Sequence, residues 1–359
     1  MTTEAPLLNA EKVEATANAA FGYLGGAVIA TTIWLGDELG LYRAMRGAGP
    51  LTTHEVAKMA GLHERWVREW LQGQAAAGLI DYAAGRFELS PEAALVLADE
   101  ENPASAIGGF ADLPEQFRGA AKLPGSFRSG LGHPYDDGGE AVARGVERMF
   151  APWHKTMLTT TALPSLDGVV ERLEAGASVA DVGCGAGVAA VTVARAFPKS
   201  QVHGFDNSKF ALARAEANIA AAGAKNVQLH NPDSGDGLPG APTFDLVMTL
   251  DCLHDMTRPD IVARAIRKSI RPDGTWFIVD IECGDFEQNL QNPLGGMMYG
   301  FSMMTCMSSS ASTPDGLALG TVGLPESKMR ELVLNAGFSS FERVAGLEHP
   351  FNAYYVARP

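Results

Sequence analysis

Positively charged residues are scarce in this chain of 359 residues, which has 28 lysines and arginines against 42 aspartates and glutamates. The formal net charge of −14 disfavours a nucleic-acid-binding protein, because such proteins gain much of their affinity by neutralising phosphates. Cysteine is rarer still: the four are Cys184, Cys252, Cys283 and Cys306, and they are not paired as metal ligands are. We therefore expect reduced thiols, no metal site and a cytoplasmic location.

The chain also lacks a basic N-terminal region followed by an apolar core and a cleavage site, so we expect no signal peptide. One uncharged stretch is long, residues 15–36 (ATANAAFGYLGGAVIATTIWLG). It is long enough to span a bilayer, but it contains four glycines and the segment before it is acidic. We predict a buried helix, which could lie at a dimer interface, and no membrane partner.

Residues 51–90 have the pattern of a winged helix. Residues 51–60 and 64–77 predict two helices, and the second has apolar residues at helical spacing. Residues 78–90 alternate around a glycine turn, as a β-wing does. The arginines of the second helix are offset by neighbouring glutamates, which disfavours a DNA-reading role.

The most informative motif is residues 181–187 (DVGCGAG), which stand between a predicted strand and a predicted helix. A glycine-rich turn in this position can hold a nucleoside-type cofactor, because glycine adopts positive φ and lets a ligand approach the backbone. The spacing differs from the G-x-G-x-x-G pattern of dinucleotide turns. The carboxylate of Asp181 would repel a pyrophosphate and would attract an ammonium group.

Polar residues also stand at the ends of the next predicted strands. Asp206 ends the second strand, where an acid can accept hydrogen bonds from a ribose diol. Asp233 follows the third strand, the pair His254–Asp255 follows the fourth, and a fifth strand is predicted over 273–280. With these motifs in order, residues 175–345 resemble the class I S-adenosylmethionine-dependent methyltransferase domain.

The winged helix extends the resemblance, because plant-type O-methyltransferases have such an N-terminal domain, which dimerises. The resemblance implies an α/β fold with a Rossmann-like sheet in the order 3-2-1-4-5-7-6, the last strand of that order antiparallel, and an α-helical winged-helix N-terminal domain. It implies a dimerisation and cap domain over 1–100, a helical connector lining the substrate site over 101–170, and the cofactor-binding methyltransferase domain over 171–359.

The resemblance implies S-adenosyl-L-methionine as the cofactor. The residues that it assigns to the cofactor are Asp181, Gly183, Gly185, Gly187, Asp206, Asn207, Asp233, Ser234 and Asp251. His254 matches the general base of the plant-type enzymes, and an imidazole with an ordinary pKa of about 6.5 can take a proton from a hydroxyl or thiol. Asp255 is the second catalytic candidate, although we expect it to cap the following turn, and Glu326 or Glu282 could support the histidine.

Candidates for the acceptor pocket come from the connector and from the methionine-rich segment after the fifth strand, because ligands bind beyond the carboxyl ends of the strands. These candidates are Tyr135, Phe150, Trp153, His154, Met298, Tyr299 and Met303.

We expect methyl transfer to a hydroxyl or sulfur of a small-molecule acceptor by a homodimer with no nucleic-acid partner. S-methylation of a thiol or thioether with little or no base assistance, a protein or RNA methyltransferase, and a transcription regulator with a cofactor-sensing domain remain open. A nicotinamide oxidoreductase is disfavoured by the glycine spacing and by Asp181.

Overall fold

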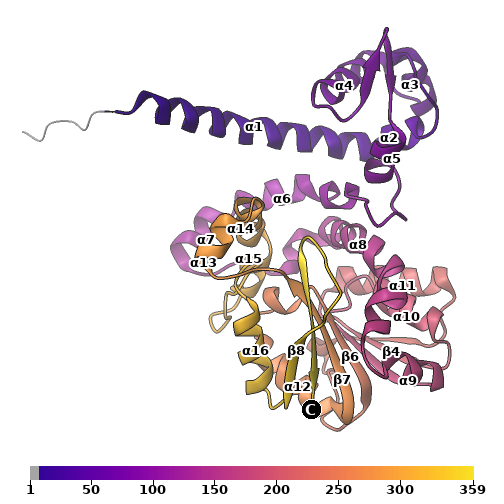
Figure 1. Cartoon of the computed structure of the whole chain (residues 1–359), viewed down its shortest axis with the longest axis vertical. Helices are drawn as coiled ribbons and strands as arrows, with labels where there is room; N and C mark the ends of the chain where they lie inside the picture. The colour runs from indigo at the N-terminus through magenta and orange to yellow at the C-terminus, as the bar shows by residue number, and fades with distance from the viewer. Residues whose placement is uncertain (1–7) are drawn as a thin grey trace, which may run out of the picture. The chain divides into compact units, whose positions relative to one another are not determined.

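The computed structural model describes residues 8–359, which divide into two compact units, one ending at Leu113 and one running Pro114–Pro359 (Figure 1). The first unit is helical with one small hairpin, in which β1 and β2 pair antiparallel. Its elements are α1 (Ala10–Glu38), α2 (Leu41–Met45), α3 (Thr53–Ala60), α4 (Glu64–Ala76), β1 (Asp81–Ala83), β2 (Arg86–Glu88), α5 (Pro91–Leu97) and the 3-10 turn η1 (Ile107–Phe110). Helices α3 and α4 followed by the β1–β2 hairpin form the winged helix that the sequence predicts.

Local signals set the start of α3 and the docking of α1. Thr52 and Glu55 form a capping box, in which each side chain accepts a hydrogen bond from the other residue's backbone N–H and satisfies a free donor of the first turn. Helix α1 packs closely on α4 at Gly36, where an added Cβ would lie 2.4 Å from a ring carbon of Trp70. A glycine is therefore required at that contact.

The prediction of a buried helix over residues 15–36 is wrong within a single chain. Helix α1 exposes Phe21, Tyr23 and Leu24 by 73%, 81% and 60%, and its buried residues lie only near its carboxyl end. Helix α1 is long and apolar enough to cross a membrane, but one such helix near an N-terminus is only weak evidence of a membrane span. An apolar surface of this kind marks a contact with another molecule.

The second unit alternates strands and helices around one sheet. Its elements are α6 (Leu113–Ala120), α7 (Leu123–Ser129), η2 (Tyr135–Gly138), α8 (Gly139–Thr156), the π turn η3 (Leu158–Ala162), η4 (Leu163–Ser165), α9 (Val169–Ala175), β3 (Ser178–Val182), α10 (Val188–Ala196), β4 (Gln201–Phe205), α11 (Lys209–Ala222), β5 (Val227–His230), η5 (Pro232–Ser234), β6 (Phe244–Leu250), η6 (Leu253–Asp255), α12 (Pro259–Ser269), β7 (Ile270–Ile281), α13 (Phe286–Gln291), α14 (Gly295–Met304), α15 (Cys306–Ser310), α16 (Glu326–Asn335), β8 (Ser340–Arg343) and β9 (Asn352–Arg358). Helix α6 begins at the boundary residue Leu113.

The seven strands of the sheet are ordered β5-β4-β3-β6-β7-β9-β8, which confirms the predicted order. Strands β3 to β7 run parallel, and β9 pairs antiparallel with both β7 and β8. The antiparallel strand is therefore the inner strand of the final hairpin, whereas the sequence analysis assigned that direction to the last strand of the order. Because the two strands of a hairpin run antiparallel to each other, β8 at the edge runs in the same direction as β7.

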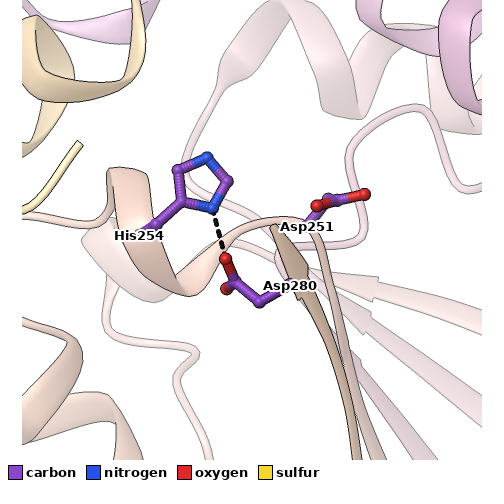
Figure 2. A group of neighbouring side chains, drawn as sticks. All are labelled: Asp251, His254 and Asp280. Carbon is purple, nitrogen blue, oxygen red and sulfur yellow. Dashed lines mark hydrogen bonds and ion pairs between the residues drawn. The ribbon is translucent and has the colours of Figure 1, made fainter. Parts of the chain in front are cut away.

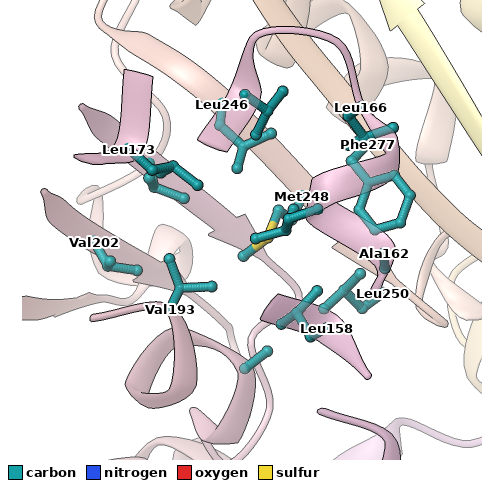
Figure 3. Packing of buried hydrophobic residues seen from close by; sticks show 14 of the residues in the cluster. Leu158, Ala162, Leu166, Leu173, Val193, Val202, Leu246, Met248, Leu250 and Phe277 are labelled. Carbon is teal, nitrogen blue, oxygen red and sulfur yellow. The ribbon is translucent and has the colours of Figure 1, made fainter. Parts of the chain in front are cut away.

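The sheet is covered on both faces, so its strands alternate between two cores. Leu246, Met248 and Leu250 of β6 pack with η3, η4, α9 and α10 on one face (Figure 3). On the other face, Trp276 and Ile278 of β7 pack against α12 and α16. This burial on both faces fixes the register of the parallel strands, whose carboxyl ends share one edge of the sheet.

The connector contributes to the second unit as well. Helix α8 packs on α10 and α11, and Glu147 accepts hydrogen bonds from Arg214 and Asn218 of α11. Helix α8 ends at Thr156, and the chain continues as the π turn η3 and the 3-10 turn η4, which contains Pro164.

Candidate cofactor and acceptor site

The glycine turn lies at the carboxyl end of β3. Gly183, Gly185 and Gly187 all have positive φ, at 76°, 52° and 70°, and a Cβ at Gly183 would lie 2.7 Å from Sγ of Cys252. The backbone N–H of Gly183 donates to the carbonyl of Phe205 at 2.8 Å, which ties the turn to the end of β4. The turn therefore offers a backbone surface without side chains beside the ends of two parallel strands.

Two carboxylates flank this turn. Asp206 Oδ2 accepts a hydrogen bond from the N–H of Gly185 at 2.8 Å, and its Oδ1 accepts one from the N–H of Ser208 at 2.8 Å. Asp181 is 1% exposed, and its Oδ2 has no hydrogen-bond partner among the described residues. Burial, and secondarily the charge of Asp206, raises the pKa of Asp181 to about 7.

A buried carboxylate oxygen without a partner is costly, so the site is complementary to a cation that donates hydrogen bonds. The ammonium group of S-adenosylmethionine meets that requirement, and the Asp206 carboxylate stands where a ribose diol could bond. The residues present therefore fit this cofactor.

The other residues predicted for the cofactor lie in the loops after β4 and β5. Asn207 is exposed beside Asp206. Asp233 and Ser234 form the exposed turn η5, in which the Asn231 side chain accepts from the N–H of Asp233 and the Ser234 hydroxyl donates to the carbonyl of Asn231.

His254 forms a buried dyad with a carboxylate of the neighbouring strand (Figure 2). Nδ1 of His254 lies 2.7 Å from Oδ1 of Asp280, and the two side chains are 4% and 1% exposed. Burial lowers the pKa of a histidine, but the charges and hydrogen bonds of Asp280 and Cys306 outweigh it and hold the pKa of His254 well above its usual range. The second oxygen of Asp280, Oδ2, has no partner among the described residues.

Asp280 is the partner of His254 that the sequence analysis missed, and both partners that it offered are wrong. Glu282 pairs with Arg343, and Glu326 pairs with Arg330 and Arg343. The sequence did contain a signal for Asp280. It ends the fifth predicted strand, which neighbours the strand that leads into His254, so both side chains fall at the same edge of the sheet.

Asp255 and Asp251 lie on either side of the histidine in sequence. Burial raises the pKa of Asp255 to about 7, and Asp255 does not cap α12, which begins after Arg258 without a side-chain cap. Asp251 has a φ of 56°, and both of its carboxylate oxygens accept from Nδ2 of Asn352 at 2.6 Å. Burial, and secondarily the charge of Asp280, raises the pKa of Asp251 to about 7.

The donor atoms of Asp251, His254 and Asp280 all lie within 4.8 Å of one another. The hydrogen bonds from His254 to Asp280 and from Asn352 to Asp251 use these atoms, so we interpret the group as a hydrogen-bonded cluster. It lies at the carboxyl ends of β6 and β7, next to β3 and its glycine turn in the strand order.

The candidate acceptor residues fall into two groups. Tyr135 belongs to η2, whose Asp136 accepts from the Ser208 hydroxyl near the cofactor turn. On α8, the Trp153 ring stacks on Tyr354 with 5.9 Å between centroids, the His154 ring stacks on Phe150 at 6.3 Å, and burial lowers the pKa of His154 to about 4.

On α14, Met298 is 5% exposed, Met303 is 37% exposed, and Tyr299 lies edge-on to Phe286 with 6.5 Å between centroids. Helix α14 packs on α15, and α15 packs on η6, which contains His254. The methionine-rich segment is therefore connected to the dyad through α15.

Comparison with known proteins agrees with this geometry. Residues 173–312 match the family model described as a methyltransferase domain, and residues 27–99 match the Rv2258c-like winged HTH domain. Among curated proteins, a ribosomal RNA small subunit methyltransferase C of Pseudomonas entomophila is 35% identical over 106 residues, which is 29% of each chain. The chain thus spans less than a third of the length of the curated relatives it matches.

Solved structures resemble the whole chain. A putative O-methyltransferase of Nostoc punctiforme has a TM-score of 0.69 at 18% identity, with 100% of each chain covered. Human N-acetylserotonin methyltransferase in complex with S-adenosylmethionine has a TM-score of 0.70 at 15% identity, with 99% of each chain covered. CalO1, a methyltransferase in calicheamicin biosynthesis solved with S-adenosylhomocysteine, has a TM-score of 0.67 at 18% identity, covering 98% of this chain and 100% of that one. At these identities the likeness establishes the fold.

Fold, glycine turn and family match together identify a methyltransferase domain over residues 173–312. More particularly, the chain combines this methyltransferase domain with a winged helix-turn-helix domain over residues 27–99, and the residues around its glycine turn fit S-adenosyl-L-methionine.

Proposed function

We propose that this protein transfers a methyl group to a hydroxyl or sulfur of a small-molecule acceptor, with His254 as general base. The observation that carries the proposal is the buried pair of His254 and Asp280 beside the cofactor turn, with 2.7 Å between Nδ1 and Oδ1. Such a pair is arranged to take up a proton, because the carboxylate stabilises the imidazolium that forms.

The cofactor would be held from the turn outward. Asp181 would receive the ammonium group, Asp206 the ribose hydroxyls, and the loop with Asp233 and Ser234 would face the adenine; Asn207 and Asp251 would complete the surround. When bound, S-adenosylmethionine supplies a methyl group already activated by a sulfonium. The chain's own task is then to position the acceptor and to remove its proton.

His254 would perform that second task through its two ring nitrogens. Nδ1–H donates to Asp280, which leaves Nε2 free to accept the proton of the acceptor. Its burial, at 3% exposure, removes water that would compete for that position. Candidates on η2, α8 and α14 would form the acceptor pocket: Tyr135, Phe150, Trp153, His154, Met298, Tyr299 and Met303.

Oxygen is the favoured acceptor atom. The human structural neighbour is by name an N-acetylserotonin methyltransferase, and another neighbour is by name a mitomycin 7-O-methyltransferase. A thioether acceptor has no proton to lose and would leave the dyad without a use, so it is the second candidate.

Ion pairs between arginines and glutamates on α4 disfavour a role of the winged helix as a DNA-binding transcription regulator. Arg65 bonds Glu69 at 2.6 Å and Arg68 bonds Glu64 at 2.7 Å, so the helix offers few uncompensated charges to phosphates.

The exposed apolar helix α1 supports a cytoplasmic homodimer rather than a membrane anchor. Gly22, Gly25 and Gly26 have open space at the position of a Cβ, which allows a second helix to approach closely. We expect Leu24→Glu to convert a dimer to a monomer in light scattering coupled to size exclusion, with Glu11→Gln as the matched control. Vesicle flotation of the wild-type protein would instead indicate a membrane partner.

The test of function is S-adenosylhomocysteine release by the purified protein supplied separately with the low-mass and the macromolecular fractions of a cell extract. We expect release with the low-mass fraction, lost in His254→Ala while cofactor binding persists. Release only with the macromolecular fraction would show that the acceptor is a protein or RNA and not a small molecule. Unchanged turnover in His254→Ala would show that His254 is not the general base.

A further inference from the structure

The segment between α7 and α8, residues 130–139, is fastened at one end to the region of α15, and we call it the strap. The backbone N–H of Gly132 donates to the carbonyl of Ala311 at 2.9 Å. The N–H of His133 donates to the hydroxyl of Ser308, a buried residue of α15, also at 2.9 Å. A Cβ at Gly132 would overlap the carbonyl of Ser308, so this end of the strap can lie against α15 only with a glycine there.

The other end of the strap is fastened beside the cofactor turn. The hydroxyl of Ser208 donates to Oδ1 of Asp136 at 2.5 Å, and the N–H of Ser208 donates to Asp206, the carboxylate predicted to bind the ribose. Ser208 is buried, and a hydrogen bond to a charged acceptor is strengthened where water is excluded. Burial raises the pKa of Asp206, and the charge of Asp136 acts in the same direction, which places the two carboxylates close together.

The two attachments lie on either side of β3 in the sheet. Ser208 follows β4, whereas α15 packs on η6, which follows β6. The strand order places β3 between β4 and β6. The strap therefore bridges the carboxyl edge of the sheet across the strand that ends in the glycine turn.

We propose that the strap is a gate over the cofactor site and that the hydrogen bond between Ser208 and Asp136 is its latch. The cofactor enters and leaves when the strap moves away from the end of β4. Gly139, which begins α8 with a φ of 63°, provides a hinge at the end of the strap next to the latch. Asp136 is a positioning residue in this scheme, because it acts through Ser208 and not on the reacting atoms.

A gate has a kinetic signature that differs from that of a direct contact with the ligand. A gate that closes equally over the empty and the occupied site slows entry and exit by the same factor, because both require the open strap. It therefore leaves the Kd unchanged. A direct contact with the cofactor slows exit alone and lowers the Kd.

The association and dissociation rates of S-adenosylhomocysteine are measured by surface plasmon resonance on the immobilised full chain. Asp136→Ala removes the latch and should raise both rates by about tenfold, with the Kd within about twofold of the wild-type value. Asp136→Asn keeps an acceptor oxygen and should raise both rates less. The change is made at Asp136 because Ser208 also caps α11.

Asp137→Ala is the matched control, since it removes the neighbouring carboxylate of the same turn, which pairs with Lys122 at 3.0 Å. Both rates should stay at the wild-type values in this variant. Gly132→Ala tests the other attachment, because an added Cβ pushes the strap off α15 and should also speed both entry and exit. The thermal midpoint establishes that each variant is folded.

Rates in Asp136→Ala equal to those in Asp137→Ala would overturn the gate. A faster dissociation alone, with a raised Kd, would overturn it as well, because Asp136 would then contact the cofactor directly. An effect of Asp136→Ala without one of Gly132→Ala would show that the strap does not move as a unit. Cofactor exchange needs no acceptor, so these results are independent of the proposed methyl transfer.

Discussion

Replacing Asp280 by asparagine tests the dyad while keeping the volume of the side chain. The variant removes one negative charge from a buried pair whose members lie 2.7 Å apart. A hydrogen bond to a charged group contributes about 1.5–3 kcal/mol, which corresponds to about one to two pKa units at the histidine. The asparagine amide can also donate to Nδ1, which would place the ring proton on Nε2 and block that atom as an acceptor.

The expected kinetic result follows from both effects. A general base contributes about 10²–10⁴-fold to a rate, so Asp280→Asn should lower kcat by about 10²-fold or more. Affinity for S-adenosylhomocysteine should persist, because Asp280 lies outside the glycine turn. Glu282→Gln is the matched control: it makes the same chemical change two residues away, at a carboxylate that pairs with Arg343.

The pH profile provides a second readout with a defined sign. His254 must be neutral to accept a proton, and Asp280 and Cys306 raise its pKa above the usual value against the effect of burial. The wild-type rate should therefore rise with pH along a limb centred above about 6.5. In Asp280→Asn the charge that raises the pKa of His254 is gone, so burial lowers this pKa and the rising limb of the pH–rate profile should move to lower pH. Turnover of Asp280→Asn equal to that of Glu282→Gln, with an unmoved limb, would refute the reasoning.

Three further changes test the cofactor turn and the first unit. The pKa of Asp181 is raised to about 7, and the ionised carboxylate is the form that attracts an ammonium group. As the pH is increased toward 7, the affinity for S-adenosylhomocysteine measured by calorimetry should therefore rise by up to about tenfold per pH unit, and it should level off above 7. Asp181→Asn should flatten this dependence. Gly183→Ala should weaken binding by about tenfold or more, because a Cβ there meets Cys252 at 2.7 Å and φ is +76°; unchanged affinity would argue that the turn does not hold the ligand. Thr52→Ala removes the capping box with Glu55 and should lower the free energy of unfolding by about 1 kcal/mol, with no effect on turnover.

The sequence predicted the sheet well, because burial on both faces leaves a strong local signal. Strands β3 to β7 are short apolar runs bounded by turns, and polar residues at their ends identify the carboxyl edge. The direction of the final hairpin was assigned to the wrong strand, since pairing between β7 and β9 is a nonlocal property. Helix α1 was predicted as buried because its composition is apolar, but composition does not say which molecule covers it.

The site was predicted less completely, for a geometric reason. Motif matching found His254 because it lies in a recognisable dipeptide, whereas its partner Asp280 comes from a segment 26 residues further along the chain. Asp280 could have been found by combining the predicted strand order with the rule that neighbouring parallel strands end at the same edge.

The dyad also bears on which atom receives the methyl group. Burying an ionisable pair costs free energy through desolvation, and an acceptor such as a thioether, which has no proton, would gain nothing from it. An acceptor that must lose a proton makes use of each feature: Nδ1 is held by Asp280, Nε2 remains to take up a proton, and water is excluded. A phenol-type hydroxyl or a thiol can donate a hydrogen bond to Nε2, so the chemistry of the base itself favours an acceptor with an acidic O–H or S–H group.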